Sequence, residues 1–227
     1  MAPTYVVGSR DRCPTAHVAR TRLSSPIPPA RRHEMNDLKT TMRRHALARR
    51  DLVTQQEAHD AAAAICASAL ALVEKLSTAG SAPVVSVYWP IRSELNTRPL
   101  IETLCERGLT VALPILVAVK RPLLFRAFEP GDELAKGPFG LSEPSSDKAT
   151  LEPDIVFAPL AAFDRKGYRL GYGGGLYDAT LNALRAKHAV TAIGIAYAVQ
   201  EADSIPIEDH DQKLDFIVTE RETIRCA

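Results

Sequence analysis

The segment Asp164–Asp178, D-R-K-G-Y-R-L-G-Y-G-G-G-L-Y-D, holds five of the twelve glycines of the chain. An apolar run, Asp154–Phe163, precedes it, and Tyr177, Leu181 and Leu184 follow at helical spacing. The predicted order is therefore strand, glycine loop, helix. Glycine lets backbone N–H groups approach an anion closely, and a helix N-terminus adds about half a positive charge at the same place. The segment predicts a phosphate-binding loop.

Two charged residues flank this loop. Arg169 stands just before it, where a guanidinium can bind phosphate or carboxylate through two hydrogen bonds. Asp178 lies in the first turn of the helix, where the helix dipole favours a carboxylate that can hold a cation. The better-known templates do not fit, because G-x-G-x-x-G would need glycine at Leu176 and no Gly-Lys-Ser/Thr is present. A flexible turn is the alternative, and the flanking charges favour anion binding.

The composition limits the classes of protein to which the chain can belong. A length of 227 residues is typical of one large domain or two small ones, and 46% hydrophobic with 24% charged residues is ordinary for a globular chain. The net charge of +1 argues against nucleic acid or an acidic membrane as the main partner. No apolar run reaches transmembrane length. The four cysteines lack disulfide density and metal-ligand spacing, which favours a reducing, cytoplasmic location.

Residues 1–34 differ from the remainder, 35–227. They are rich in arginine and proline and have no periodic apolar pattern, which predicts a disordered N-terminal arm before a single catalytic domain. Two alternatives stay open for this arm. It is an organelle-targeting peptide, since such peptides are Arg-rich and acid-poor, or it is an artefact of gene calling and Met35 is the true start.

From Asn36 the pattern predicts a helix. Its expected apolar side consists of Leu38, Met42, Leu47 and Leu52. Lys39 and Arg43 are four residues apart and share a face, where like charges repel by a few tenths of a kcal/mol. A nearby anion would relieve that repulsion, whereas a solvated basic face is the alternative.

Local signals place the next elements. Thr54-Gln55-Gln56-Glu57 is a capping box that opens a second helix. Strands are expected at Pro83–Tyr88 and at Leu109–Leu113, the latter closed by Pro114, with a helix capped by Thr97 between them. Such a strand–helix–strand unit implies a parallel pair of strands.

The later elements complete the predicted fold. Strands are expected at Arg121–Phe128, Thr191–Tyr197 and before Val218, while the turn-rich segment Glu129–Glu152 predicts a long irregular lid. Neither an internal repeat nor a second domain is visible. The predicted class is α/β, a single three-layer αβα domain with a mainly parallel sheet.

Trp89 and Glu94 follow the first strand. Ligands of open α/β sheets bind at the carboxyl ends of the strands, so both residues are candidates for a binding site. Trp89 suits stacking on a flat heterocycle, although a core anchor is the alternative. Glu94 could equally form a salt bridge with Arg92 or Arg98.

The segment Ile205–Val218 carries the last candidate. Mg²⁺ is usually held by one or two carboxylates together with phosphate oxygens, and Asp178 with Asp211 could supply the carboxylates. Asp209 is an alternative that spacing leaves open. His210 alone lacks a second histidine at ligand spacing and fits a loop hydrogen bond better.

Four motifs together resemble one family. The segment F-D-R-K-G-Y-R-L-G-Y-G-G-G-L-Y-D resembles the signature of 5-formyltetrahydrofolate cyclo-ligases, F-D-x-x-G-x-R-L-G-x-G-x-G-Y-Y-D, with Leu176 in place of tyrosine. Y-W-P-I-R-S-E, F-G-L-S-E-P and the P-x-E-x-H-D-x-x-x-D pattern near His210 resemble further segments of the same family. The resemblance runs from about residue 37 to about residue 220, in family order.

The resemblance implies ATP- and Mg²⁺-dependent cyclisation of 5-formyltetrahydrofolate to 5,10-methenyltetrahydrofolate, with release of ADP and phosphate. It implies a catalytic role for Arg169 and selects Asp211, with Asp178, as the metal ligands. The residues implied for ATP are Lys39, Arg43, Arg169, Leu170, Gly171, Tyr172, Gly173, Gly174, Gly175, Leu176 and Tyr177. Those implied for the folate are Trp89, Glu94, Tyr172 and Leu176.

We expect a monomer whose partner is the small-molecule substrate, without nucleic acid or membrane. Two rival functions stay open. Leu176 cannot donate the hydroxyl hydrogen bond of a tyrosine, which permits a folate-binding or regulatory relative that has lost catalysis. The same phosphate loop could also serve an enzyme acting on another acyl or sugar-phosphate substrate.

Overall fold

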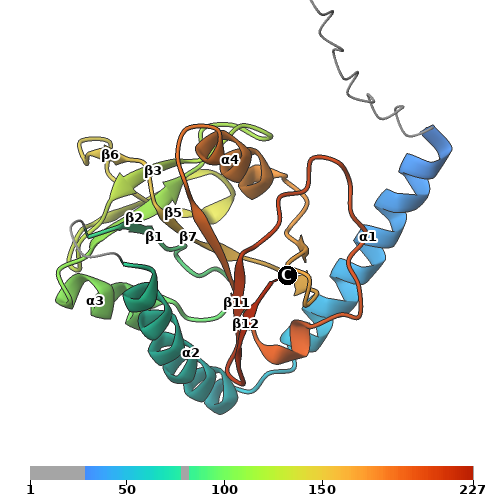
Figure 1. The fold of residues 1–227 in the computed structure, drawn as a ribbon, viewed down its shortest axis with the longest axis horizontal. Coiled ribbons are helices and arrows are strands. Elements are labelled where there is room, and N and C mark those ends of the chain that lie inside the picture. The colour runs from blue at the N-terminus through green and yellow to red at the C-terminus, as the bar shows by residue number, and fades with distance from the viewer. Residues whose placement is uncertain (1–28, 78–81, 227) are drawn as a thin grey trace, which may run out of the picture.

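The computed structural model describes residues 29–77 and 82–226 (Figure 1). The arm expected at residues 1–34 therefore lies largely outside the described residues. An eight-stranded sheet runs through the centre in the order β12-β11-β10-β7-β1-β2-β3-β6. Its strands are β1 (Val84–Ser86), β2 (Thr110–Ile115), β3 (Leu124–Ala127), β6 (Thr150–Leu151), β7 (Ile155–Pro159), β10 (Thr191–Ile195), β11 (Phe216–Val218) and β12 (Thr223–Arg225).

The middle of this sheet is parallel. The five strands from β11 to β2 pair in parallel, and β12, β3 and β6 add antiparallel pairs at the two edges. The β1–β2 pair, joined through α3 (Arg98–Glu106), confirms the predicted strand–helix–strand unit. The prediction of an α/β fold with a mainly parallel sheet is correct.

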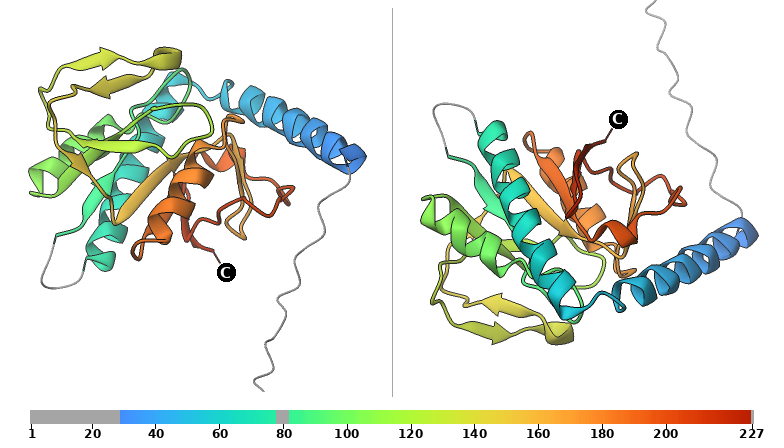
Figure 2. Two further views of the ribbon diagram at one scale, coloured as in Figure 1. Left: turned by 90° about the horizontal axis from the view of Figure 1, so that it is seen from above. Right: turned by 90° about the horizontal axis from the view of Figure 1, so that it is seen from below.

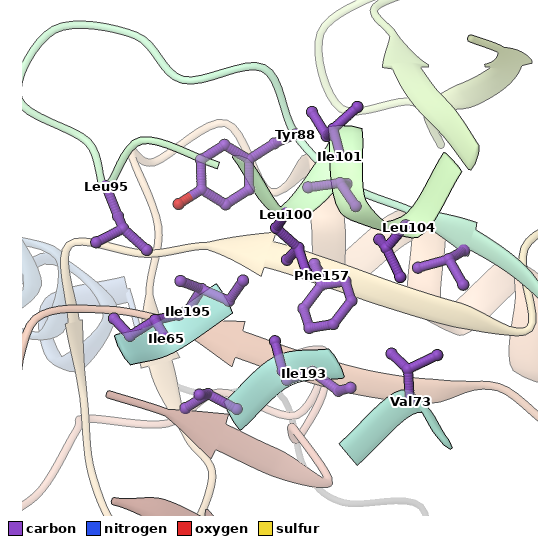
Figure 3. Close-up of a cluster of buried hydrophobic side chains, with 14 of the residues drawn as sticks. Ile65, Val73, Tyr88, Leu95, Leu100, Ile101, Leu104, Phe157, Ile193 and Ile195 are labelled. Atoms are coloured by element: carbon purple, nitrogen blue, oxygen red, sulfur yellow. The ribbon is translucent and has the colours of Figure 1, made fainter. Parts of the chain in front are cut away.

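Helices cover both faces of the sheet. Along β7, Ile155 and Phe157 pack with α2 (Gln55–Leu76) and α3, as Figure 3 shows for Phe157. Val156 and Ala158 point to the opposite face, where they pack with α4 (Leu176–Arg185). This alternation follows from the two-residue period of a strand, and burial on both faces explains the continuous apolar run in the sequence.

The helix starts agree with the sequence only in part. The capping box of α2 is present, because Thr54 Oγ1 accepts the Glu57 amide at 3.3 Å and Glu57 accepts the Thr54 amide at 2.8 Å. Thr97 stands at the N-cap position of α3 as predicted, but its side chain makes no capping hydrogen bond. Its hydroxyl instead donates to the Tyr88 carbonyl at 2.7 Å, which fastens the chain that leaves β1.

Helix α1 (Pro29–Arg50) begins before the predicted Asn36, so the proposed boundary between residues 34 and 35 falls inside a helix. The predicted apolar side is correct only in part, because Met42 packs against the buried cluster around Ala46, whereas Leu38 is 50% exposed and Leu52, beyond the helix, is 81% exposed. Ala46 and Arg50 are buried instead. The reason is visible in Figure 2, where α1 runs outward from the body and only part of its length touches the fold.

Three further predictions need correction. The segment Glu129–Glu152 is not an irregular lid, since it contains the antiparallel hairpin of β4 (Leu134–Lys136) and β5 (Ser142–Pro144), joined by η1 (Pro138–Gly140), and then β6. Pro114 lies within β2 rather than after it. It is tolerated there because the pairing with β1 ends at Ala112, so the missing N–H interrupts no bond to that strand.

The glycine loop does not follow β7 directly. A short antiparallel pair, β8 (Ala162–Phe163) with β9 (Arg169–Leu170), stands between them. Ala46 of α1 packs against this hairpin through Ala162 and Leu170, so the hairpin fixes α1 beside the loop. A further short helix, η2 (Ala198–Gln200), follows β10.

Candidate active site

A cavity of about 820 Å³ lies where α1, the glycine loop, the chain after β1 and the segment before β11 meet. Its lining brings together every residue that the sequence selected for a site. These are Lys39, Arg43, Trp89, Glu94, Arg169, Leu170, Gly171, Tyr172, Gly173, Gly174, Gly175, Leu176, Tyr177, Asp178 and Asp211. The cavity is large enough for a drug-sized ligand, within the usual range for small-molecule sites.

The glycine loop presents backbone donors to this cavity. Gly173 has φ +95° and Gly175, the N-cap of α4, has φ +63°, so two left-handed residues turn the chain into the helix. Within the part of the chain that the structure describes, the amides from Gly173 to Asp178 have no acceptor. Free amides at a helix N-terminus, without a side-chain cap, form a cradle for an anion.

Three cations line the same end of the cavity, and each has a partner. Lys39 Nζ lies 2.7 Å from Asp211 Oδ2 and 2.9 Å from Glu208 Oε2. Burial lowers the pKa of Lys39, but these two hydrogen bonds outweigh it, so the pKa is raised and the amine stays charged. Arg43 Nε donates to the Gly171 carbonyl at 2.6 Å, which ties α1 to the glycine loop.

Arg169 is held most firmly. Its side chain is only 4% exposed, and Nη2 lies 2.9 Å from Asp178 Oδ1. The same guanidinium donates to the Gln212 carbonyl, while the Gln212 amide donates to Asp178 Oδ1 at 2.9 Å. Asp178 therefore orients Arg169 and fastens the segment before β11 in one arrangement.

Three residues that could hold a metal ion lie close together before β11, and the sequence had selected only Asp211 among them. Glu208, His210 and Asp211 offer ligand atoms that lie within 4.8 Å of one another. Glu208 was missed, although it is the acid of the P-x-E-x-H-D pattern itself. Asp178 is not in this group, but its bond to the Gln212 amide places it beside the residue that follows Asp211.

The other end of the cavity is aromatic and encloses Glu94. Its Oε2 accepts the Ile91 amide at 2.9 Å, which closes the turn after β1. Burial raises the pKa of Glu94, and the Ile91 amide, Tyr172 and the charges of Arg50 and Arg92 oppose this only in part. Burial also raises the pKa of Tyr172 and Tyr177, so both phenols remain neutral donors.

Trp89 is partly occupied by protein. The Arg98 guanidinium lies 4.7 Å from its ring centroid, and Phe128 meets it edge-on at 5.6 Å. The indole therefore has one face in contact with Arg98 while it lines the cavity. Trp89 thus packs as an anchor and also lines the cavity, and its contact with a flat heterocycle stays a prediction.

The chain resembles known proteins along most of its length. The model of the 5-formyltetrahydrofolate cyclo-ligase family matches residues 35–220. The chain belongs to this family. A 5-formyltetrahydrofolate cyclo-ligase of Haemophilus influenzae is 34% identical over 71% of this chain and 87% of the relative, and one of Escherichia coli K12 is 36% identical over 61% and 78%.

Solved structures agree with the fold. The 5,10-methenyltetrahydrofolate synthetase of Aquifex aeolicus matches with a TM-score of 0.64 at 25% identity, over 83% of this chain and 93% of the other. A synthetase of Mycoplasma pneumoniae matches with a TM-score of 0.62 at 24% identity, over 80% and 98%, which supports the fold. Among the helices described, none has the length and apolar character needed to cross a lipid bilayer.

This cyclo-ligase family member differs from the signature at Leu176, the first residue of α4. Its side chain lines the cavity, and its Cγ would lie 3.4 Å from a Cβ at position 174. Tyr172 and Tyr177 line the same cavity, and both interact electrostatically with Glu94. The loss of one phenol at Leu176 thus leaves the aromatic end with donors of its own.

Sequence reasoning missed Arg50, which it did not select for any site. The residue is 3% exposed. A signal was present, because Lys39, Arg43 and Arg50 are spaced i, i+4, i+11 and share one face of α1. The inward face of this helix therefore carries cations together with the apolar side chains of Met42 and Ala46.

Proposed function

We propose that the chain catalyses the ATP-dependent cyclisation of 5-formyltetrahydrofolate to 5,10-methenyltetrahydrofolate, with release of ADP and phosphate. The single observation that carries this is that one cavity combines two chemically different sets of groups, which we call its phosphate end and its folate end. One end presents free amides and cations for phosphate, and the other presents aromatic rings around an acid.

The chemistry follows from the poor leaving ability of a formyl oxygen. Transfer of the γ-phosphoryl group of ATP to this oxygen turns it into a phosphate ester. The neighbouring folate nitrogen then attacks the formyl carbon, loses its proton, and expels phosphate with the C–O electron pair. These two reaction steps need positioning and charge neutralisation more than proton transfer.

Each charged residue at the phosphate end has a role in this proposal. Arg169 neutralises the transferring phosphoryl group, while Lys39 and Arg43 hold the remaining phosphates. The amides of Gly173 to Asp178 donate hydrogen bonds to the phosphate oxygens. The existing partners of these cations support the proposal, because they hold the side chains in position before any ligand arrives.

Magnesium fits the acids on chemical grounds. Hard carboxylate oxygens are its preferred protein ligands, and Glu208 stands with Asp211 while Asp178 lies beside the same segment. We assign Asp178 and Asp211 as the ligands, with Glu208 as a third. When bound, the ion neutralises phosphate charge.

At the other end, Glu94 would bind the pterin. A carboxylate can accept two parallel hydrogen bonds from the amino and ring N–H groups of that heterocycle. Its enclosure by Tyr88, Tyr172 and Tyr177 keeps water away and strengthens such bonds. Trp89 would contact the flat ring.

Turnover of 5-formyltetrahydrofolate by the full chain, followed as the change in folate absorbance, tests the proposal. The full chain is needed because a start at Met35 would remove the first turns of α1. We expect product only with MgATP. Folate binding, seen as a rise in Tm without turnover, would indicate a non-catalytic relative. No Tm shift and no turnover would indicate another substrate.

A further inference from the structure

Arg50 is a buried cation without a direct ionic partner. No ion pair involves it within residues 29–77 and 82–226, although it is 3% exposed. A buried charge is costly unless hydrogen bonds and nearby opposite charge compensate for it. The hydrogen-bond partners of Arg50 therefore indicate its role.

The guanidinium bridges two loops. Nε and Nη2 donate to Ser93 Oγ at 3.1 and 3.0 Å, and Nη1 donates to Tyr172 Oη at 2.7 Å. The Ser93 hydroxyl in turn donates to the Asp51 carboxylate. The Tyr172 ring also lies near Arg50, with its centroid 5.8 Å away. One side chain at the end of α1 thus joins the turn after β1 to the glycine loop.

Both bridged loops carry residues of the cavity. Ser93 directly precedes Glu94, and Tyr172 stands between Gly171 and Gly173. Glu94 and Tyr172 line the cavity, whereas Arg50 does not. A residue that touches two loops from behind, without facing the cavity, is suited to set their separation.

We propose that Arg50 is a positioning residue that holds Glu94 and Tyr172 at a fixed separation and so defines the end of the cavity that takes the folate ring. The inference rests on the proposed function and adds a residue to its folate end. The planar fork of arginine explains the residue type, because Ser93 and Tyr172 take separate N–H groups that a lysine ammonium cannot direct in the same way.

The main test is Arg50→Met in the full chain, with KM measured for each substrate. Methionine keeps much of the side-chain volume but has no N–H donor. We expect KM for 5-formyltetrahydrofolate to rise by on the order of tenfold, as for a lost hydrogen bond to a charged group, while KM for ATP changes by less than about threefold. Arg50→Lys should not restore the folate KM.

The matched control is Arg49→Met. Arg49 is the neighbouring arginine of the same helix, is exposed, and donates to the Val199 and Glu201 carbonyls away from the cavity. Loosening of α1 in general would affect both variants. A change confined to Arg50→Met identifies the bridge as the cause.

A second variant keeps the test decisive if Arg50→Met does not fold. Tyr172→Phe removes the hydroxyl that Arg50 binds and retains the ring. We expect a higher folate KM, and in the double variant much less than the sum of the two single effects. An unchanged folate KM in both single variants, or strictly additive effects, overturns the inference. Failure of the unaltered chain to turn over the folate would instead refute the proposed function.

Discussion

The two ends of the cavity hold their charged side chains in place in different ways. At the phosphate end, opposite charges pair directly, as in Lys39 with Asp211 and Arg169 with Asp178. At the folate end, Glu94 has no ion pair among the described residues, and burial raises its pKa.

The difference matches what each end would bind. A polyphosphate is strongly charged and can displace or bridge existing pairs, so cations can be held in advance without loss of function. A pterin is flat and nearly neutral. An acid that recognises it needs a dry environment in which hydrogen bonds are strong, and the raised pKa is the consequence of that environment.

The largest effect is expected for Arg169→Ala. Loss of a charged contact to the transferring phosphoryl group should lower kcat by about a hundredfold or more, or ~3–4 kcal/mol in the barrier. The matched control is Arg165→Ala in the same hairpin, whose ion pairs with Glu201 and Glu222 are exposed. If kcat of purified Arg169→Ala equals that of the parent, the pair of Arg169 with Asp178 does not contribute to catalysis.

Asp178→Asn sharpens the comparison by removing one charge from a pair. We expect the Mg²⁺ concentration for half-maximal activity to rise by about ten- to a hundredfold, because Asp178 both contributes to the metal end and orients Arg169. Asp203→Asn, an exposed aspartate outside the cavity, is the control. An unchanged magnesium titration would remove Asp178 from the metal site and leave it only its contact with Arg169.

Glu94→Gln probes the other end and should separate stability from activity. The folded pKa of Glu94 is raised, so the folded state binds this proton more tightly than the unfolded chain does. The stabilising contribution is therefore present at acid pH and is lost as pH rises through the folded pKa.

At neutral pH we expect Glu94→Gln to raise Tm by a few degrees, and this gain should vanish in acid. The folate KM should rise by about tenfold because a carboxylate acceptor is lost. Glu102→Gln, exposed on α3, is the control. The charged groups around Glu94 are Arg50 and Arg92, and the neutral phenols that face it belong to Tyr88, Tyr172 and Tyr177. A fall in Tm at neutral pH would contradict the comparison.

Gly173→Ala should have the smallest effect. A Cβ at φ +95° strains the backbone, and the loop would shift away from its anion-binding geometry. We expect KM for ATP to rise by about fivefold, which is ~1 kcal/mol, with little change in the folate KM. Gly131→Ala, at φ +100° in a turn outside the cavity, carries similar strain and should lower Tm without altering either KM.

Some features could be predicted from the sequence because they depend on local interactions. The Thr54 capping box, the helix after the glycine loop and the parallel pair through α3 depend on residues close in the chain. The family motifs named the cavity residues, because each motif is a short segment with fixed spacing. These features require no knowledge of distant neighbours.

Tertiary structure alone decided which charges meet. Lys39 pairs with Asp211 across the fold, and Arg50 reaches Ser93 and Tyr172 from a helix for which the sequence predicted a different buried side. A hydrophobic period identifies a buried face only where the burying surface is apolar, and α1 meets both an apolar hairpin and a charged cavity. The sequence by itself therefore determined the parallel sheet and the glycine loop, while long-range packing determined that cations share the inward face of α1 with Met42 and Ala46.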